Sequence, residues 1–214
     1  MKPSLLDQPL GTYLDQLASD QPAPGGGSAA AVTGSLAAGL VAMAARFSSG
    51  QLPDAADRAG RADAYRADLV AMAERDAEAY GAVLEAFRLP AEPDPQQRRR
   101  KITDALEHAA LVPLEITEVA ARTAAEAAEL AEQGNPNLRG DALTAVILAW
   151  AAARSAAELV RLNVELGALE RDLLDRARLA VARAGEAADS LSPEEAPDGS
   201  AAGPSDGPAA GAQP

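Results

Sequence analysis

The chain has 214 residues, of which 48% are hydrophobic and 3% aromatic, so one domain with a core of alanine, leucine and valine is expected. A net charge of −13 argues against binding to nucleic acid or to anionic membrane surfaces. The lack of cysteine excludes disulfides and thiolate metal sites, and the N-terminus lacks the apolar core of a signal peptide, so a cytoplasmic protein is expected.

Helical periodicity predicts the first three elements in chain order. A short helix is expected over residues 7–19, a second over 29–47 and a third over 54–88. The larger apolar residues of the second helix form one stripe: Val32, Leu36, Leu40, Met43 and Phe47. The uncharged stretch 23–45 is mostly alanine, glycine and serine, which makes it too weakly hydrophobic for a membrane span.

Two further long helices are expected after the proline-rich connection at 90–95. The fourth covers 96–132 and is expected to bend at Pro113. The last begins at Asp141, which is placed as its cap, and extends to 189. Its leucines follow the spacing of a coiled-coil seam that needs a partner helix: Leu159, Leu162, Leu166, Leu169 and Leu173.

No strand pattern is found, so the expected fold class is all-α, a bundle of about five long antiparallel helices. The predicted helical domain covers 1–191. Residues 192–214 contain proline, glycine, alanine, serine and acidic residues without a basic or aromatic one, and a disordered tail is predicted there.

A glycine-rich turn precedes the second helix, in the segment Pro22–Ala31. The prolines restrict the chain, and the glycines allow a positive φ and close backbone approach. Ser28 is a suitable N-cap, and the amides of such a helix start attract anionic or carbonyl oxygens. From these residues alone, a plain helix cap and a ligand site both remain open.

One carboxylate interrupts the apolar stripe of the third helix. Asp76 lies at the centre of the face formed by Tyr65, Leu69, Met72, Tyr80, Val83 and Phe87. Burial of a carboxylate costs several kcal/mol unless it is paired or protonated, and it raises the pKa toward the range useful in proton transfer. The alternative is a structural aspartate held by a neighbouring hydroxyl or amide.

The glycine-rich segment resembles the opening motif of the cyclodeaminase/cyclohydrolase family. These folate enzymes are found free-standing or as the C-terminal domain of formiminotransferase-cyclodeaminase. Further segments match the family's pattern in its order, over roughly residues 5–185: Asp76–Tyr80, Val112–Leu114, Gly134–Asn137 leading to Asp141, and Leu162–Asn163.

The resemblance implies a methenyltetrahydrofolate cyclohydrolase or a formimidoyltetrahydrofolate cyclodeaminase with Asp76 as general acid/base. It implies no metal and no cofactor beyond tetrahydrofolate as the substrate. A homodimer is expected from the leucine seam of the last helix and the small-residue face of the second, because long helices with two apolar sides need more partner surface than one chain supplies. The implied substrate-binding residues are Pro24, Gly25, Gly26, Gly27, Ser28, Asn135, Asn137, Asp141 and Asn163.

Other polar residues allow plainer interpretations. The loop 134–141 suits the amide edge of a pterin, but it also suits an ordinary helix connection. The basic run 98–101 fits either the glutamate tail of a folate or a solvated helix start. His108, the sole histidine, makes neither a metal site nor a catalytic triad.

Two departures from the family's pattern support a second hypothesis. Gly140 stands where the family usually has serine, and Leu159 stands where it usually has asparagine. A non-catalytic dimeric helical module that binds folate or acts as a scaffold is therefore the alternative. The carboxylate retained at Asp76 argues against it, because a protein without catalysis has no need of a buried charge.

Overall fold

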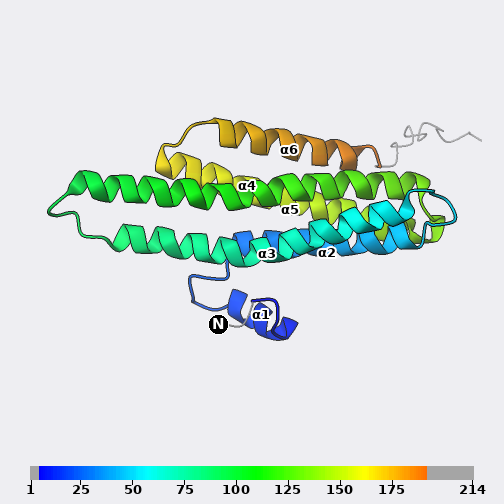
Figure 1. Ribbon diagram of the computed structural model, residues 1–214, viewed down its shortest axis with the longest axis horizontal. Coiled ribbons are helices and arrows are strands. Elements are labelled where there is room, and N and C mark those ends of the chain that lie inside the picture. Colours follow the sequence, from blue (N-terminus) through cyan, green and yellow to red (C-terminus); the bar gives the residue numbers. More distant parts are fainter. Residues whose placement is uncertain (1–4, 192–214) are drawn as a thin grey trace, which may run out of the picture.

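The computed structural model describes residues 5–191, which form an elongated bundle of helices (Figure 1). These residues contain no strand, and the predicted all-α class is confirmed. The elements are α1 (Leu10–Leu17), α2 (Gly26–Arg46), α3 (Ala55–Arg88), α4 (Pro95–Gln133), the 3-10 turn η1 (Pro136–Leu138), α5 (Arg139–Gly167) and α6 (Asp172–Asp189). The predicted tail, 192–214, lies outside the described residues.

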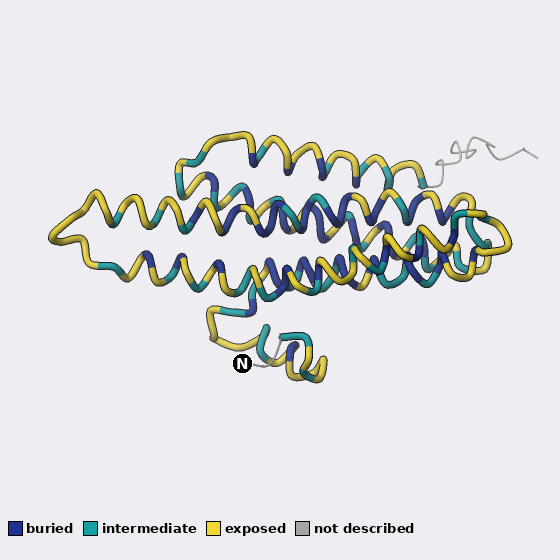
Figure 2. Tube along the Cα trace, in the orientation of Figure 1, coloured by how far each residue is buried: buried dark blue, intermediate teal, exposed yellow. Residues whose placement is uncertain are grey.

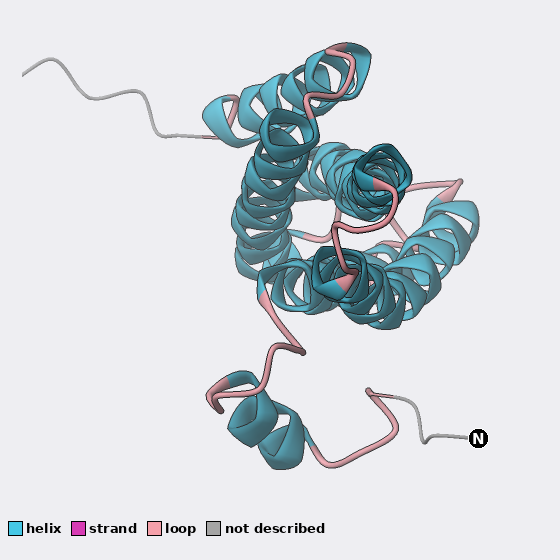
Figure 3. Cartoon of the chain, turned by 90° about the vertical axis from the view of Figure 1, so that its left-hand side faces the viewer, coloured by secondary structure: helices cyan, strands magenta, loops and turns pink. Residues whose placement is uncertain are grey.

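Helices α2 to α5 form the body of the molecule. The strongest contacts join α4 to α5, α2 to α3 and α2 to α5, while α6 packs along α4 and α5 on one side (Figures 1 and 3). The α3–α4 hairpin extends past the start of α2, and α1 stands off from the bundle on the side opposite α6. α4 continues through Pro113 as one helix.

Alanine dominates the core, which runs along the middle of the bundle (Figure 2). Small side chains let helix backbones approach closely, and this compensates for the scarcity of large apolar residues. In α2 the small residues face inward, among them Ala31, Ala38 and Ala45. Of the larger residues, Leu36 is 60% exposed and Phe47 is 61% exposed, whereas Val32 and Leu40 are partly buried against the core. The small-residue face is therefore used within the chain.

The predicted last helix is wrong in its extent, because the chain reverses after Gly167. Ala168 adopts a left-handed conformation with φ of 49°, and the N–H of Leu169 donates to the carbonyl of Val164 at 3.0 Å. Leu169 and Leu173 then pack against α4 inside the chain, whereas Leu162 and Leu166 are exposed. The expected leucine seam is therefore divided between two helices.

The predicted cap of this helix is also wrong. Asp141 lies within the first turn of α5, and the N-cap position is Leu138, which makes no side-chain capping bond. The 3-10 turn over Pro136–Leu138 leads directly into the helix, so that the helix begins earlier than the sequence predicts.

Two stretches are long and apolar enough for a membrane span when judged by length and composition alone, Gly26–Arg46 and Pro136–Gly167. In the first, 61% of the most apolar window is buried inside the bundle, and in the second 39%. Core helices of soluble proteins share these properties, and the alanine-lined contacts of α2 are those of a core helix.

Candidate functional site

A cavity of about 390 Å³ lies where the start of α2 meets the middle of α3 and the C-terminal half of α5. Its wall is mainly apolar. The polar side-chain groups in this wall are the Asp76 carboxyl, the Asn163 amide and the Tyr80 hydroxyl. The lining residues are Pro22, Ala23, Gly25, Gly26, Gly27, Asp76, Ala77, Ala79, Tyr80, Ala109, Leu159, Leu162 and Asn163. Five of the predicted site residues thus share one cavity, from Gly25 to Asn163.

Asp76 from α3 caps the first turn of α2. The N-cap residue is Gly25, which has no side chain to accept a hydrogen bond. The N–H of Ser28 instead donates to Oδ2 of Asp76 at 3.1 Å. Ser28 is therefore not the N-cap that the sequence predicts; it is the third residue of the helix, and its backbone amide is the donor.

Gly27 allows this contact to form. A Cβ atom at Gly27 would overlap the Asp76 carboxylate, whereas a Cβ at Gly26 would meet only Leu159 at 4.0 Å. No glycine among the described residues has a positive φ, so that part of the sequence interpretation is wrong. The close approach that it predicted is present, and it concerns Gly27 specifically.

The Asp76 carboxyl is half-buried. Burial raises its pKa above the ordinary value of 3.8, and the hydrogen bond from the Ser28 N–H opposes part of that rise. No arginine or lysine in residues 5–191 forms an ion pair with Asp76. A carboxyl without a cationic partner in a partly desolvated site is suited to taking up and releasing a proton.

The opposite wall comes from α4 and α5. Nδ2 of Asn163 donates to the carbonyl of Ala109 at 2.8 Å, which fixes the orientation of the amide. Leu159, the departure from the family's asparagine, lines the same wall as Leu162. Tyr80 faces the cavity from α3, one helical turn after Asp76. The arrangement offers flat apolar surface beside two fixed polar groups.

Two other predicted residues support the cavity from behind. Pro24 is buried and lines an adjoining hollow that shares Pro22 and Ala23 with the cavity. Ser28 is fully buried, and its hydroxyl shares a hydrogen bond of 3.3 Å with that of Tyr13. Sequence reasoning missed Tyr13; the available signal was that it is the one aromatic residue of α1.

The loop at 134–141 lies at the other end of α2. The N–H of Asn135 donates to Oγ of Ser48 at 2.9 Å, and its Nδ2 donates to the carbonyl of Phe47 at 3.0 Å. Its Oδ1 accepts from the N–H of Asn137 at 3.0 Å. Asn135 is thus occupied in fastening the loop to the end of α2.

The 21 residues of α2 separate that loop from Gly26 by about 30 Å, at 1.5 Å per residue. Within one chain, the structure therefore does not bring Asn135, Asn137 or Asp141 to the cavity of Asp76. Gly140, the second departure, has open space around its Cα.

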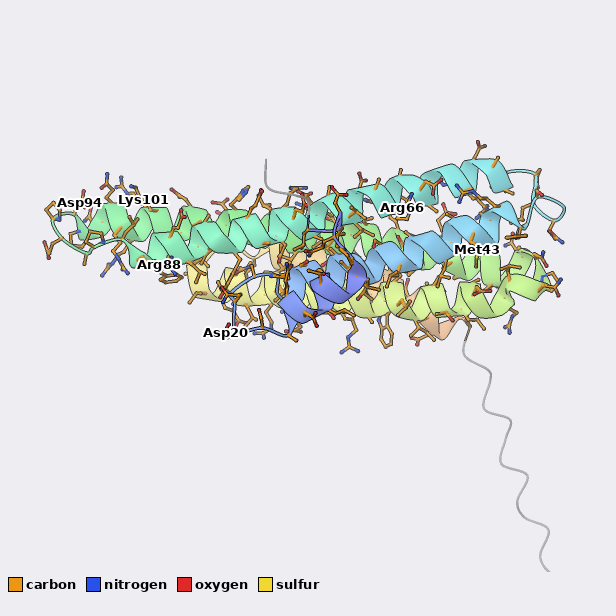
Figure 4. All side chains as sticks on the ribbon, turned by 90° about the horizontal axis from the view of Figure 1, so that it is seen from below. Asp20, Met43, Arg66, Arg88, Asp94 and Lys101 are labelled. Atoms are coloured by element: carbon orange, nitrogen blue, oxygen red, sulfur yellow. The ribbon has the colours of Figure 1, made fainter. Side chains whose placement is uncertain are left out.

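The basic run lies at the tip of the α3–α4 hairpin, where Figure 4 places Arg88, Asp94 and Lys101 together. The guanidinium of Arg98 donates to the carbonyls of Leu89 at 2.7 Å and Phe87 at 3.0 Å. Arg98 thus caps the end of α3, which is a structural role. His108 is exposed on α4.

Comparisons with known proteins agree with the resemblance seen in the sequence. The family model described as formiminotransferase-cyclodeaminase matches residues 9–173. The methenyltetrahydrofolate cyclohydrolase of Methylorubrum extorquens is 38% identical over 162 residues, which cover 72% of this chain and 78% of that protein. The formimidoyltransferase-cyclodeaminase of Mus musculus is 33% identical over 147 residues, which cover 64% of this chain and 27% of that longer protein.

A structural relative shares the helical architecture. The crystal structure of formiminotetrahydrofolate cyclodeaminase from Thermotoga maritima aligns with a TM-score of 0.76 and 26% sequence identity, covering 85% of this chain and 92% of that one. Because the family model also spans most of the sequence, the chain belongs to the formiminotransferase-cyclodeaminase family.

Proposed function

We propose that this chain is a one-carbon enzyme acting on tetrahydrofolate derivatives, either a methenyltetrahydrofolate cyclohydrolase or a formimidoyltetrahydrofolate cyclodeaminase. The observation that carries the proposal is the Asp76 carboxyl, held at the start of α2 on the wall of a mainly apolar cavity. The named activities of the relatives in Methylorubrum extorquens and Thermotoga maritima support the substrate class.

In the hydrolase reaction, Asp76 acts first as a base and then as an acid. The carboxylate takes a proton from water as the new C–O bond forms at the methenyl carbon. This carbon then bears a hydroxyl group between the two folate nitrogens. The protonated Asp76 gives its proton to one nitrogen as that C–N bond breaks, and the hydroxyl group loses its proton to water as the formyl C=O bond forms. The ionised carboxylate also offsets the positive charge of the methenyl substrate before water adds.

In the deaminase reaction, the same carbon passes through a similar tetrahedral arrangement. A folate N–H nitrogen attacks the formimino carbon and the ring closes. The proton of the attacking nitrogen passes to the former imino nitrogen, which leaves an amino group on the tetrahedral carbon. Asp76 gives a proton to this amino group, and ammonia leaves with its bonding pair. Both reactions therefore need one proton-exchanging group beside a carbon held between two nitrogens.

The cavity walls support the binding of a flat ring system. Tyr80, Leu159 and Leu162 supply apolar surface, and the fixed amide of Asn163 supplies hydrogen bonds. The amides of Gly26 and Gly27 at the start of α2 favour negative charge on a ligand oxygen or on Asp76 itself. The proposal requires no metal and no cofactor beyond the folate substrate, and we place the enzyme in the cytoplasm.

A homodimer is part of the proposal, although its basis differs from the expected leucine seam. α2 carries no charged residue from Gly26 to Ala45, yet it turns Leu36 and Phe47 outward. An uncharged helix with exposed large side chains is suited to contact with a second copy. Met43, which is labelled in Figure 4, is partly buried and lies on the same side of α2 as Leu36, two helical turns further along.

Antiparallel pairing of two α2 helices would bring the distant loop to the cavity. A two-fold axis near the middle of α2 places the residue-47 end of one copy beside the residue-26 end of the other. Asn137 and Asp141 of the second copy would then approach the substrate bound near Asp76. This arrangement accommodates the predicted binding residues that one chain keeps apart.

The variant Asp76→Asn tests the proposal, because it keeps the size and the hydrogen-bonding ability of the side chain but removes its proton exchange. Turnover of methenyl- or formimino-tetrahydrofolate is expected to fall by about 100-fold or more, the usual scale of acid–base catalysis, with a much smaller change in folate affinity. Full activity in this variant would refute the proposed mechanism.

The competing function is a non-catalytic folate-binding or scaffold module, and Leu159 at the cavity wall is the observation in its favour. Titration of the wild-type protein with folate, followed by a turnover assay on the same preparation, separates the two. Binding without turnover of either substrate selects the module.

A further inference from the structure

The α1 segment is attached to the bundle at few points. It stands apart in Figures 1 and 3, and its side chains Leu10 and Leu14 are exposed. Tyr13 is the exception: it is 3% exposed and is the one buried residue of the helix. A single aromatic side chain thus inserts from α1 toward the start of α2.

A chain of hydrogen bonds links this tyrosine to the cavity. The hydroxyl groups of Tyr13 and Ser28 lie 3.3 Å apart, and the N–H of Ser28 donates to Asp76 at 3.1 Å. Among the described residues, no buried side-chain polar atom lacks a hydrogen-bond partner. Removal of the Tyr13 hydroxyl would leave the Ser28 hydroxyl buried and unpaired, which is costly in a low-dielectric interior.

The first turn of α2 has particular need of outside support. It follows Gly25 and begins with Gly26 and Gly27, and glycine loses the most backbone freedom on joining a helix. The turn also lacks a capping side chain from its own N-cap residue. Its order therefore depends on the two groups that reach Ser28 from other elements, Asp76 from α3 and Tyr13 from α1.

We propose that Tyr13 is a positioning residue: through Ser28 it holds the first turn of α2 in the orientation that aims the Ser28 N–H at Asp76. The inference rests on the proposed function of Asp76. Tyr13 does not line the cavity, so its effect passes through the serine. In this way α1 stabilises the first turn of α2 beside Asp76.

The test is Tyr13→Phe, which keeps the ring in place and removes one oxygen. We expect kcat to fall about 10-fold, with KM changed by less than about 2-fold, since the binding walls are untouched and the loss of one buried hydrogen bond has this scale. Ser28→Ala should give a similar loss, and the double variant should lose little more, because both changes remove the same bond.

Tyr65→Phe is the matched control. Tyr65 lies on α3 outside the cavity, and its ring lies under the guanidinium of Arg122, a contact that phenylalanine also makes. This variant should keep wild-type kcat and KM.

A spectroscopic readout separates this inference from the proposed function. In wild type, the amide proton shift of Ser28 should follow the ionisation of Asp76 as pH changes, through the bond that joins them. In Tyr13→Phe the amplitude of this shift should fall by at least half, and the Ser28 amide should exchange with solvent faster. Wild-type kcat together with an unchanged Ser28 titration in Tyr13→Phe would overturn the inference. Absence of turnover in the wild type would instead refute the proposed function, and the amide titration would still test the link.

Discussion

The substitution Gly27→Ala tests the geometry of the site most directly. The added Cβ would overlap the Asp76 carboxylate, although the helical backbone of Gly27 accepts alanine without strain. The carboxylate must withdraw by about 1 Å or more to reach normal contact, which breaks its 3.1 Å bond with the Ser28 N–H. The perturbation is therefore confined to one carboxyl group and one amide.

The expected magnitude follows from opposing effects. A hydrogen bond to a charged group contributes about 1.5–3 kcal/mol, and alanine is better than glycine in a helix by about 1 kcal/mol. The net loss of stability is thus about 0.5–2 kcal/mol, which lowers the Tm of a chain of this size by about 1–8 °C. Misplacement of a catalytic group by about 1 Å costs up to about 100-fold in turnover.

The assay combines thermal unfolding with turnover of methenyl- and formimino-tetrahydrofolate. Gly60→Ala is the control, because a Cβ at that position of α3 meets nothing within 4 Å. It should keep turnover and gain slightly in Tm. Adding Asp76→Ala to Gly27→Ala removes the overlap, so Tm should recover while turnover stays low. Wild-type turnover and Tm in Gly27→Ala would refute the reasoning.

Three further predictions concern charge, assembly and the C-terminal segment. Because burial raises the pKa of Asp76, its ionisation costs stability in the folded protein. The difference in the free energy of unfolding between wild type and Asp76→Asn, measured by calorimetry, should therefore shift against the wild type as pH rises from 3.8 through the raised pKa. Above the raised pKa this difference should stay level. A difference that does not depend on pH would contradict the prediction. Leu36→Asp with Phe47→Asp should convert a dimer to a monomer in light scattering, and a monomeric wild type at micromolar concentration would refute the dimer. Removal of 192–214 should leave Tm and folate affinity unchanged because the segment has few apolar residues, and a large loss of either would show that it docks.

Helix positions were predictable where proline and glycine punctuate the chain. The predicted 54–88 and 96–132 correspond to α3, Ala55–Arg88, and α4, Pro95–Gln133. Asp76 was also found from the sequence, because a charged residue inside an apolar helical stripe is visible without a structure. The bond that holds it was not, since its donor is a backbone amide 48 residues away.

The division of the last helix was not predictable from its leucines. Leu159 to Leu173 keep a helical spacing through the point where the chain reverses, and no proline marks the turn. The reversal lets Leu169 and Leu173 pack on α4, and periodicity within one segment contains no information about that partner. The prediction that the loop at 134–141 joins the site of Asp76 in the same chain was wrong for a similar reason. The order of motifs along the chain contains no information about the distance between them in the bundle.

α2 illustrates which properties the sequence determines and which only the tertiary structure decides. Its composition determines a long, uncharged helix with one face of small residues and one of large ones. Both faces are apolar, so hydrophobicity alone does not choose which of them points inward. Packing chooses the small face, because alanine lets neighbouring backbones approach closely, and this approach carries the Ser28 amide within hydrogen-bond distance of Asp76. The residues of the site were determined by the sequence, and their meeting was decided by the contact of the two helices.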